Sequence, residues 1–81
     1  MDRIDISAVP GPVLRAARAR IVRAWRDGMS LDRAIDLAAA DAYATAREAG
    51  YDDDRGLRFA DFTRAVGAEM RAAVEDVLRP A

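Results

Sequence analysis

An apolar stripe in the last third of the chain, between Leu57 and Arg79, restricts the fold more than any other feature of the sequence. Apolar residues recur there at gaps of 3, 4, 4, 3 and 4 positions, which is 18 residues in five steps. A step of 3.6 residues is the period of an amphipathic α-helix. The residues of the stripe are Phe59, Phe62, Val66, Met70, Ala73 and Val77. We therefore predict a helix over residues 57–79 that forms the wall against which the rest of the chain packs.

Two shorter helices are predicted before this one, over residues 12–27 and 31–49. Pro12 suits the first position of a helix, and Gly28 suits the position just after its end. Ser30 suits the N-cap of the second helix, because its hydroxyl can accept a free backbone N–H. The apolar stripe of the second helix is mostly alanine, which lets neighbouring helices approach closely. The sequence therefore predicts an all-α fold of three helices.

Residues 1–11 do not follow the helical period. Ile4 and Ile6 alternate with polar residues, as in a short extended strand. We therefore divide the chain into an extended N-terminal arm over residues 1–11 and a single helical domain over residues 12–81. The arm either packs on the helices of its own chain or reaches a second subunit, and the sequence leaves both arrangements open.

Bulky apolar side chains are few for a chain of 81 residues. Of the 42 apolar residues, 19 are alanine, which favours helices and buries little area. A single core of this size rarely supplies more than about 3–5 kcal/mol unless a disulfide, a metal or a second subunit adds to it. Because the chain has no cysteine, disulfides and thiolate metal sites are excluded. We therefore predict a homodimer whose interface contains apolar side chains left with few bulky partners in the chain, namely Ile4, Ile6, Leu37, Met70, Val74, Val77 and Leu78.

The residue types that most enzymes use are missing. The chain has no histidine, cysteine or lysine, which removes the usual general base near neutral pH, the thiol nucleophile and the nitrogen and sulfur ligands of zinc. We therefore expect neither catalysis nor a cofactor. The remaining enzymatic alternative is a small acid–base enzyme built from carboxylates and tyrosine.

Arginine residues cluster on the first predicted helix. Residues 1–26 carry a net charge of +4 and residues 27–81 carry −5, so opposite charges favour contact between these parts, within one chain or between two copies. No acidic residue lies between Pro12 and Arg26, so pairs within this helix cannot neutralise the arginines. The arginines are either solvated and paired with acids of neighbouring helices, or they form a surface that binds an acidic partner. The candidate partner-binding residues are Arg15, Arg20, Arg23, Arg26 and Tyr43.

The short turn over residues 27–30 also permits a helix-turn-helix interpretation, in which the Arg-rich first helix takes part in nucleic-acid binding. The second predicted helix argues against it, because its polar positions are net acidic and phosphates repel an acidic helix. A simple helical hairpin explains the same turn. We therefore expect no nucleic-acid partner and keep this function as an alternative.

The predicted main loop, over residues 50–56, contains three consecutive carboxylates: Asp52, Asp53 and Asp54. They are weak candidates for a cation site, because calcium prefers carboxylate and other oxygen ligands. The spacing does not fit an EF-hand loop, since Tyr51 and Arg55 fall where that motif requires ligands. We therefore expect no metal, and instead an acidic solvated loop that faces the arginines of the first helix.

No segment is predicted to cross a membrane, because no apolar run approaches the roughly 18 residues that a spanning helix needs. Residues 1–9 are charged and too short for a signal peptide, so we expect a cytoplasmic protein. Thirteen arginines and no lysine indicate a GC-rich, bacterial gene. The function that these features favour is a non-catalytic helical interaction module (an adaptor, regulator or accessory subunit) that binds another protein and itself forms a homodimer.

Overall fold

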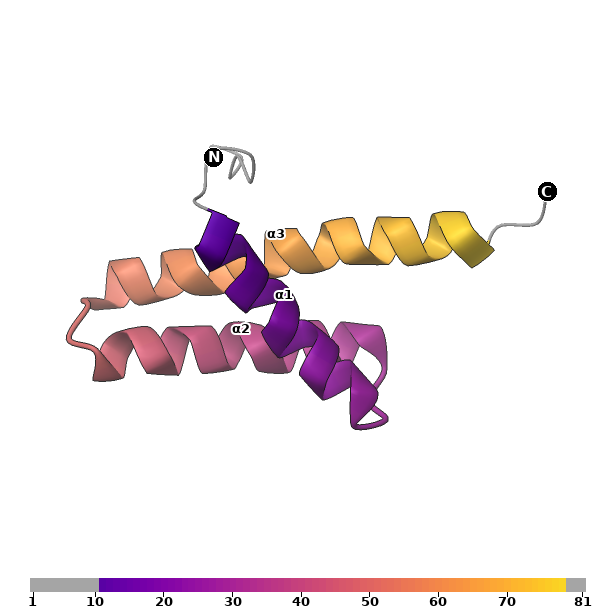
Figure 1. Ribbon diagram of the computed structural model, residues 1–81. Helices are drawn as coiled ribbons and strands as arrows, with labels where there is room; N and C mark the ends of the chain where they lie inside the picture. The colour runs from indigo at the N-terminus through magenta and orange to yellow at the C-terminus, as the bar shows by residue number, and fades with distance from the viewer. Residues whose placement is uncertain (1–10, 79–81) are drawn as a thin grey trace.

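Three α-helices make up the fold (Figure 1). The structure is a computed structural model that describes residues 11–78, with the backbone alone for Leu78. The helices are α1 (Gly11–Arg26), α2 (Leu31–Glu48) and α3 (Asp53–Leu78), and no strand occurs within this described range. The prediction of an all-α fold of three helices is therefore confirmed for these residues.

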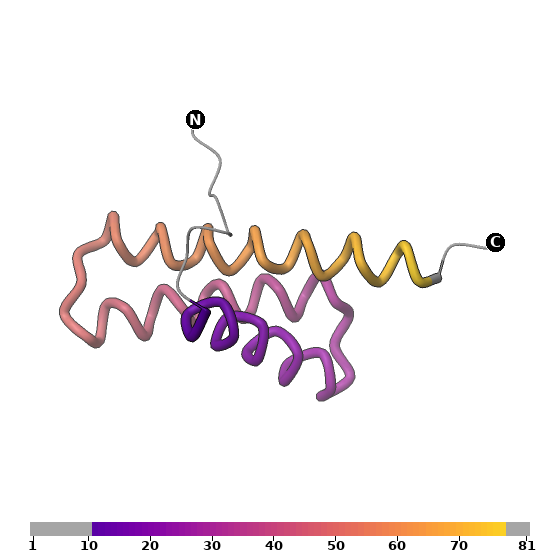
Figure 2. The backbone as a smooth tube through the Cα atoms, turned by 45° about the horizontal axis from the view of Figure 1, so that its top comes forward, coloured from indigo at the N-terminus to yellow at the C-terminus, as the bar shows by residue number. Residues whose placement is uncertain are grey.

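α2 and α3 form an antiparallel hairpin, and α1 lies across one face of it (Figures 1 and 2). α2 has contacts with both other helices, and its contacts with α3 are the more extensive. Six residues of α2 are buried, and five of them are alanine. Small side chains on a central helix let both neighbours approach closely. The alanine stripe predicted as the packing surface of the second helix therefore lies in the core.

The core lies where the three helices meet, and it contains few large side chains. Its buried members are Ala17, Ile21, Ala34, Ile35, Ala38, Phe62 and Val66. Val66 is fully buried, Phe62 is 7% exposed, and Met70 packs against their edge. The middle of the predicted α3 stripe therefore forms the core wall, whereas Phe59 and Val77 at its ends are exposed.

Two glycines of α3 face side chains of α2 so closely that a Cβ there would not fit without a shift. A Cβ added at Gly67 would lie 2.6 Å from Cγ1 of Ile35, and one added at Gly56 would lie 2.9 Å from a ring carbon of Tyr43. Carbon atoms that are not bonded separate to about 3.5–4.0 Å at their optimal contact. Both positions therefore require glycine for close packing of the helices and not for a turn.

Both turns between helices end the preceding helix with a glycine in the left-handed region. Gly28 has φ 93° and Gly50 has φ 96°, values that other residues rarely adopt. The Oγ atom of Ser30 accepts a hydrogen bond from the backbone N–H of Arg33 at 3.2 Å, which is the geometry of an N-cap. The predicted ends of the first helix and the predicted cap of the second are thus confirmed to within one residue.

The start of α3 differs from the prediction, because the segment expected to be a loop up to Gly56 is largely helical. The carboxylate of Asp52 accepts the backbone N–H of Arg55 at 2.9 Å and so caps the helix. Asp53 and Asp54 occupy the first turn, where negative charge favours the helix dipole. α3 therefore begins at Asp53, four residues before the predicted start, and the predicted loop shrinks to a short turn.

The C-terminal turns of α3 extend past the ends of the other two helices (Figures 1 and 2). Arg71 forms an ion pair with Asp32, which lies in the first turn of α2. Because α2 begins at Leu31, the residues of α3 after Arg71 have no part of α2 beside them. None of the helices in the described range combines the length and the apolar character that crossing a bilayer takes.

Candidate functional site

Two adjoining hollows follow the junction between the N-terminal halves of α1 and α3. Their volumes are about 370 and 300 Å³, and both are lined by Val13, Phe59 and Phe62. Volumes of this size are at the lower end of ligand-binding clefts, which span about 300–1,000 Å³. We call these hollows together the basic groove and define it by Val13, Arg20, Arg55, Arg58, Phe59 and Phe62.

Aromatic contacts hold one wall of the basic groove in place. The rings of Tyr51 and Phe59 lie with their centroids 5.6 Å apart at an angle of 59°, which is a favourable tilted arrangement. The guanidinium of Arg55 lies 5.7 Å from the centre of the Tyr51 ring, within the range of a cation–π interaction. This stack fixes Arg55 and Phe59 at the mouth of the groove while both remain exposed.

The basic groove carries positive charge on apolar walls. Its described lining contains Arg20, Arg55 and Arg58 and no carboxylate. Arg20 lies 3.5 Å from Asp41, but both side chains are solvated, and such exposed pairs contribute little. Within residues 11–78, neither Arg55 nor Arg58 has a carboxylate within ion-pair distance. The groove therefore favours a partner that is both apolar and acidic.

The neighbouring aspartates form no ion pair with the groove arginines in the described residues. Asp54 lies four residues before Arg58 and therefore on the same side of α3, but beyond ion-pair distance of its guanidinium. Asp53 accepts a hydrogen bond from the hydroxyl of Tyr43 on α2, and Asp52 caps α3. Asp52 and Asp53 thus bind different partners, and in the described part of the chain no group of three or more acidic side chains is arranged to hold a metal ion.

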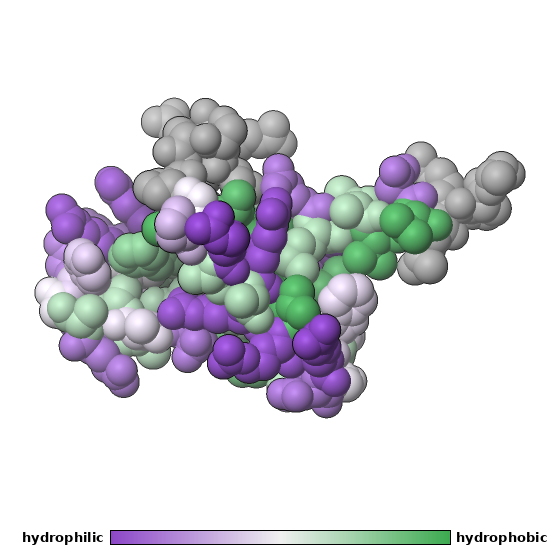
Figure 3. All heavy atoms as spheres, viewed as in Figure 1, coloured by the Kyte–Doolittle hydropathy of each residue, from purple (hydrophilic) through white to green (hydrophobic). Residues whose placement is uncertain are grey.

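A second unusual surface is the end of α3, residues 72–78, which we call the α3 tail. Val77 is 83% exposed, the largest exposure of any bulky apolar side chain in the described residues, and Val74 is half-buried. Figure 3 shows an apolar patch on this outer end of α3. The tail also contains two carboxylates, Glu75 and Asp76, and no basic residue. The tail therefore carries net negative charge between two arginines that flank it in the sequence, Arg71 and Arg79, and its apolar side is uncovered at Val77 in one copy of the described chain.

Some of the residues predicted at a dimer interface lie on this tail. Val74 and Val77 lie on the α3 tail, and Met70, one turn earlier on the same helix, packs against the edge of the core. Leu37 is 49% exposed but lines a different hollow, of about 480 Å³, between α1 and α2. The remaining predicted interface residues, Ile4, Ile6 and the side chain of Leu78, lie outside the description.

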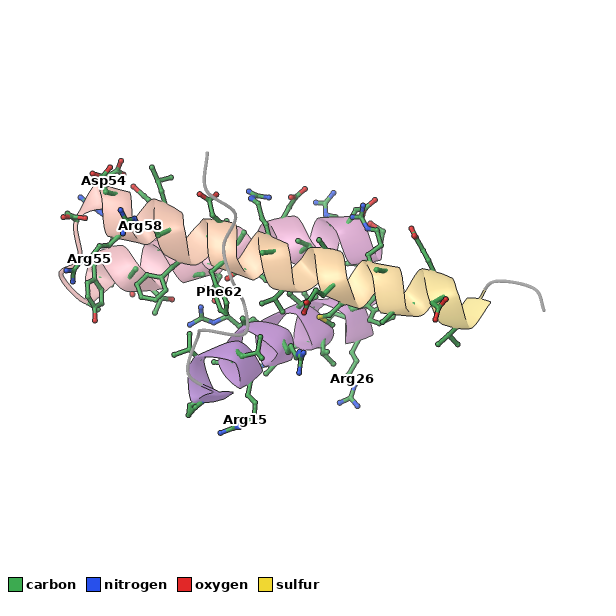
Figure 4. The ribbon with its side chains drawn as sticks, turned by 90° about the horizontal axis from the view of Figure 1, so that it is seen from above. Arg15, Arg26, Asp54, Arg55, Arg58 and Phe62 are labelled. Carbon is green, nitrogen blue, oxygen red and sulfur yellow. The ribbon has the colours of Figure 1, made fainter. Side chains whose placement is uncertain are left out.

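The predicted partner-binding residues are spread over the molecule. Arg15 and Arg26 lie near opposite ends of α1 and point away from α3 (Figure 4). Arg20 reaches Asp41 of α2, and both Arg20 and Arg23 line the hollow beside Leu37. The structure does not gather these arginines around a single point. The acidic segment over residues 52–54 was expected to face these arginines. Its contacts lie instead within the α2–α3 hairpin, where Asp52 caps α3 and Asp53 accepts the hydroxyl of Tyr43.

Tyr43, the fifth predicted partner-binding residue, belongs to the α2–α3 hairpin. Its hydroxyl donates to Asp53, and its ring lies over the position of Gly56. The hydrogen bond to the Asp53 carboxylate, followed by desolvation, raises the pKa of Tyr43 above its usual value. A tyrosine that holds its proton more firmly stabilises this contact and is a weaker acid near neutral pH.

The sequence reasoning did not predict the arginines of the basic groove on α3. Arg55 and Phe59 are four residues apart, and so are Arg58 and Phe62. Residues four apart share one side of a helix. The signal was therefore already present for Arg58 and Phe62 in the helix predicted over residues 57–79, whereas the pair of Arg55 and Phe59 requires the helix to begin at Asp53.

Comparison with protein families, with characterised proteins and with solved structures gives no match for this chain. The interpretation of its function therefore rests on the two surfaces, the basic groove and the α3 tail.

Proposed function

We propose that this protein is a cytoplasmic, non-catalytic helical interaction module that acts as a homodimer and presents a helical face to another protein. The observation that supports this most directly is the α3 tail. An apolar stripe that forms the core wall at Val66 continues along the same helix to Val77, which is 83% exposed. Burying a valine side chain stabilises an association by about 1.5–3 kcal/mol, so a partner surface over the tail is favoured.

The small core supports the same proposal. Only four of the seven buried residues at the centre of the fold are larger than alanine. Small domains commonly add stability by association when they have no disulfide or metal. A second copy that covers the tail would add apolar burial that residues 11–78 of one copy lack.

Val77→Ser tests the proposal in the full-length protein. In a symmetric dimer each substitution occurs twice, so we expect the dimer Kd to rise roughly tenfold or more, since each 1.4 kcal/mol corresponds to a factor of ten. Sedimentation velocity at micromolar concentration measures the fraction of dimer. A wild-type chain that remains a folded monomer throughout this range would disprove the proposal.

Leu57→Ser is the matched control. Leu57 also lies on α3 and is 49% exposed, but it belongs to neither the α3 tail nor the basic groove. We expect this variant to associate as the wild type does. Because both side chains are exposed, circular dichroism is expected to show unchanged helix content for both variants.

A further inference from the structure

From the two surfaces described above we infer that the basic groove of each copy receives the α3 tail of the other. This inference rests on the proposed homodimer and specifies its geometry. It assigns an occupant to the groove, namely an acidic amphipathic helix end of a second identical chain. The basic groove and the α3 tail both belong to the described residues, so each surface can be altered by substitution without changing the other.

The charges of the two surfaces are complementary. Arg55 and Arg58 lie at the groove without a carboxylate partner within residues 11–78. The α3 tail carries Glu75 and Asp76 and no basic residue. Complementary charges favour the correct partner and orientation of an interface over others. A tail packed against a second tail would instead bring like charges together.

The apolar parts of the two surfaces also correspond. Val13, Phe59 and Phe62 line the groove as large apolar side chains, and two of them are more than a third exposed. Val74 and Val77 are three residues apart, so they share one side of the tail helix. Seating them in the groove covers the exposed ends of the α3 stripe, Phe59 and Val77, in one contact.

The positions of the surfaces allow a closed dimer. The groove residues Arg55, Arg58 and Phe62 lie in the N-terminal part of α3 (Figure 4), and the tail is the C-terminal end of the same helix (Figure 1). Two copies placed with their α3 helices antiparallel therefore bring each tail to the groove of the other. Such a two-fold arrangement forms the contact twice and leaves neither surface free, which is the usual form of a homodimer.

Cysteine cross-linking tests this arrangement, because the wild-type chain has no cysteine. Full-length Val13→Cys and Val77→Cys variants are mixed at equal concentration under a mild oxidant, and the disulfide-linked species are identified by mass spectrometry. The two positions cannot react within one chain, since Val77 lies 15 residues beyond Phe62, or about 22 Å along the helix. Leu57→Cys replaces Val13→Cys in the control mixture.

We expect the Val13–Val77 link to form roughly tenfold or more faster than the Leu57–Val77 link, because docking holds the first pair at high effective concentration. Equal rates would overturn the inference and leave the groove to a different acidic partner. A dominant Val77–Val77 link would also overturn it, although the proposed homodimer would stand. A monomer in sedimentation would overturn both.

A charge exchange provides a second readout that does not depend on the cysteines. Arg58→Glu and Asp76→Arg are each expected to weaken the dimer several-fold, whereas the double variant is expected to regain the affinity of the wild type. Such rescue arises only if the two sites interact across the interface. Additive losses in the double variant would overturn the inference even if the dimer persists.

Discussion

Asp52 is the residue that sets where α3 begins, because its carboxylate accepts the backbone N–H of Arg55. Removing an N-cap side chain commonly destabilises a protein by about 1 kcal/mol. We therefore expect Asp52→Ala to lower the free energy of unfolding by about that amount, and Asp52→Asn to preserve most of it because the amide oxygen can also accept. Urea unfolding followed by circular dichroism measures the difference.

Asp54→Ala is the control for this prediction. Asp54 lies in the first turn of α3 and has a favourable interaction with the helix dipole, but it caps no backbone group in the described contacts. We expect a loss at the low end of about 0.3–1 kcal/mol. Equal losses for Asp52→Ala and Asp54→Ala would show that the charge, and not the cap, determines the helix start.

Tyr43 gives the stability of the protein a dependence on alkaline pH. The pKa of its hydroxyl is raised in the folded chain, chiefly by the hydrogen bond to Asp53, so folding favours the protonated form. This contribution is fully present below the unfolded pKa near 10 and is lost as the pH rises through the raised folded pKa. We therefore expect the Tm difference between wild type and Tyr43→Phe to shrink above about pH 10.

Differential scanning calorimetry at a series of pH values from about 8 to 12 measures this effect. Tyr51→Phe serves as the control, because it also removes one tyrosine hydroxyl but leaves the Tyr43–Asp53 hydrogen bond in place. A Tm difference for Tyr43→Phe that stays constant across the series would contradict the assignment of this hydrogen bond.

Among the helices, the absence of a side chain at Gly67 allows α3 to pack closely against Ile35 of α2. An added Cβ would lie 2.6–2.8 Å from three side-chain atoms of Ile35, which is buried in the core and has no room to move. Overpacking of this kind destabilises by about 1–3 kcal/mol, and the better helix propensity of alanine offsets about 1 kcal/mol of that. We expect Gly67→Ala to be destabilising by up to about 2 kcal/mol in urea unfolding.

Gly56→Ala is the matched comparison on the same helix. Its Cβ would lie 2.9 Å from the Tyr43 ring, but this ring is only half-buried and can move outward. We therefore expect a smaller loss than at Gly67. The strain at Gly67 can be checked further with Ile35→Ala, because the double variant is expected to lose less than the sum of the single losses.

These two glycines also explain where the sequence was informative and where it was not. The regular spacing from Phe59 to Val77 predicted a helix correctly, because periodicity is a property of one segment. The prediction failed at Gly56, since a glycine in a loop and a glycine within a helix that admits a neighbouring ring look the same in a sequence. Only the position of Tyr43 on another helix distinguishes them.

The candidate site likewise has one part that the sequence could predict and one part that it could not. Exposed apolar positions near Val77 could be predicted because the chain has too few bulky residues to cover them. The basic groove could not, because Val13 and Phe59 are far apart in sequence and meet only through the way α1 crosses the hairpin. The arginines of α1 therefore indicated a positively charged surface, but they did not indicate that Arg55 and Arg58 of α3 line the groove.

For the molecule as a whole, homodimerisation predicts that stability depends on protein concentration. A partner that binds the folded state alone raises the apparent Tm as its concentration rises. We expect the Tm of the wild type to increase between about 1 and 100 times the dimer Kd, and the Tm of Val77→Ser to change less over the same concentrations. Calorimetry or thermal circular dichroism over this range measures it, and a Tm independent of concentration would contradict the homodimer.

Because α3 is one continuous helix, the number of residues between its two ends determines both the distance between them and the relative direction of their side chains. Each residue inserted between Val66 and Val74 would turn the α3 tail by about 100° and move it by about 1.5 Å relative to Phe62. One insertion would therefore preserve every side chain of both surfaces and still aim Val77 in another direction. About 11 added residues, or three turns, would restore the direction but displace the tail by about 16 Å. In the inferred dimer, the number of residues between Phe62 and Val77 therefore matters as much as the identity of either one.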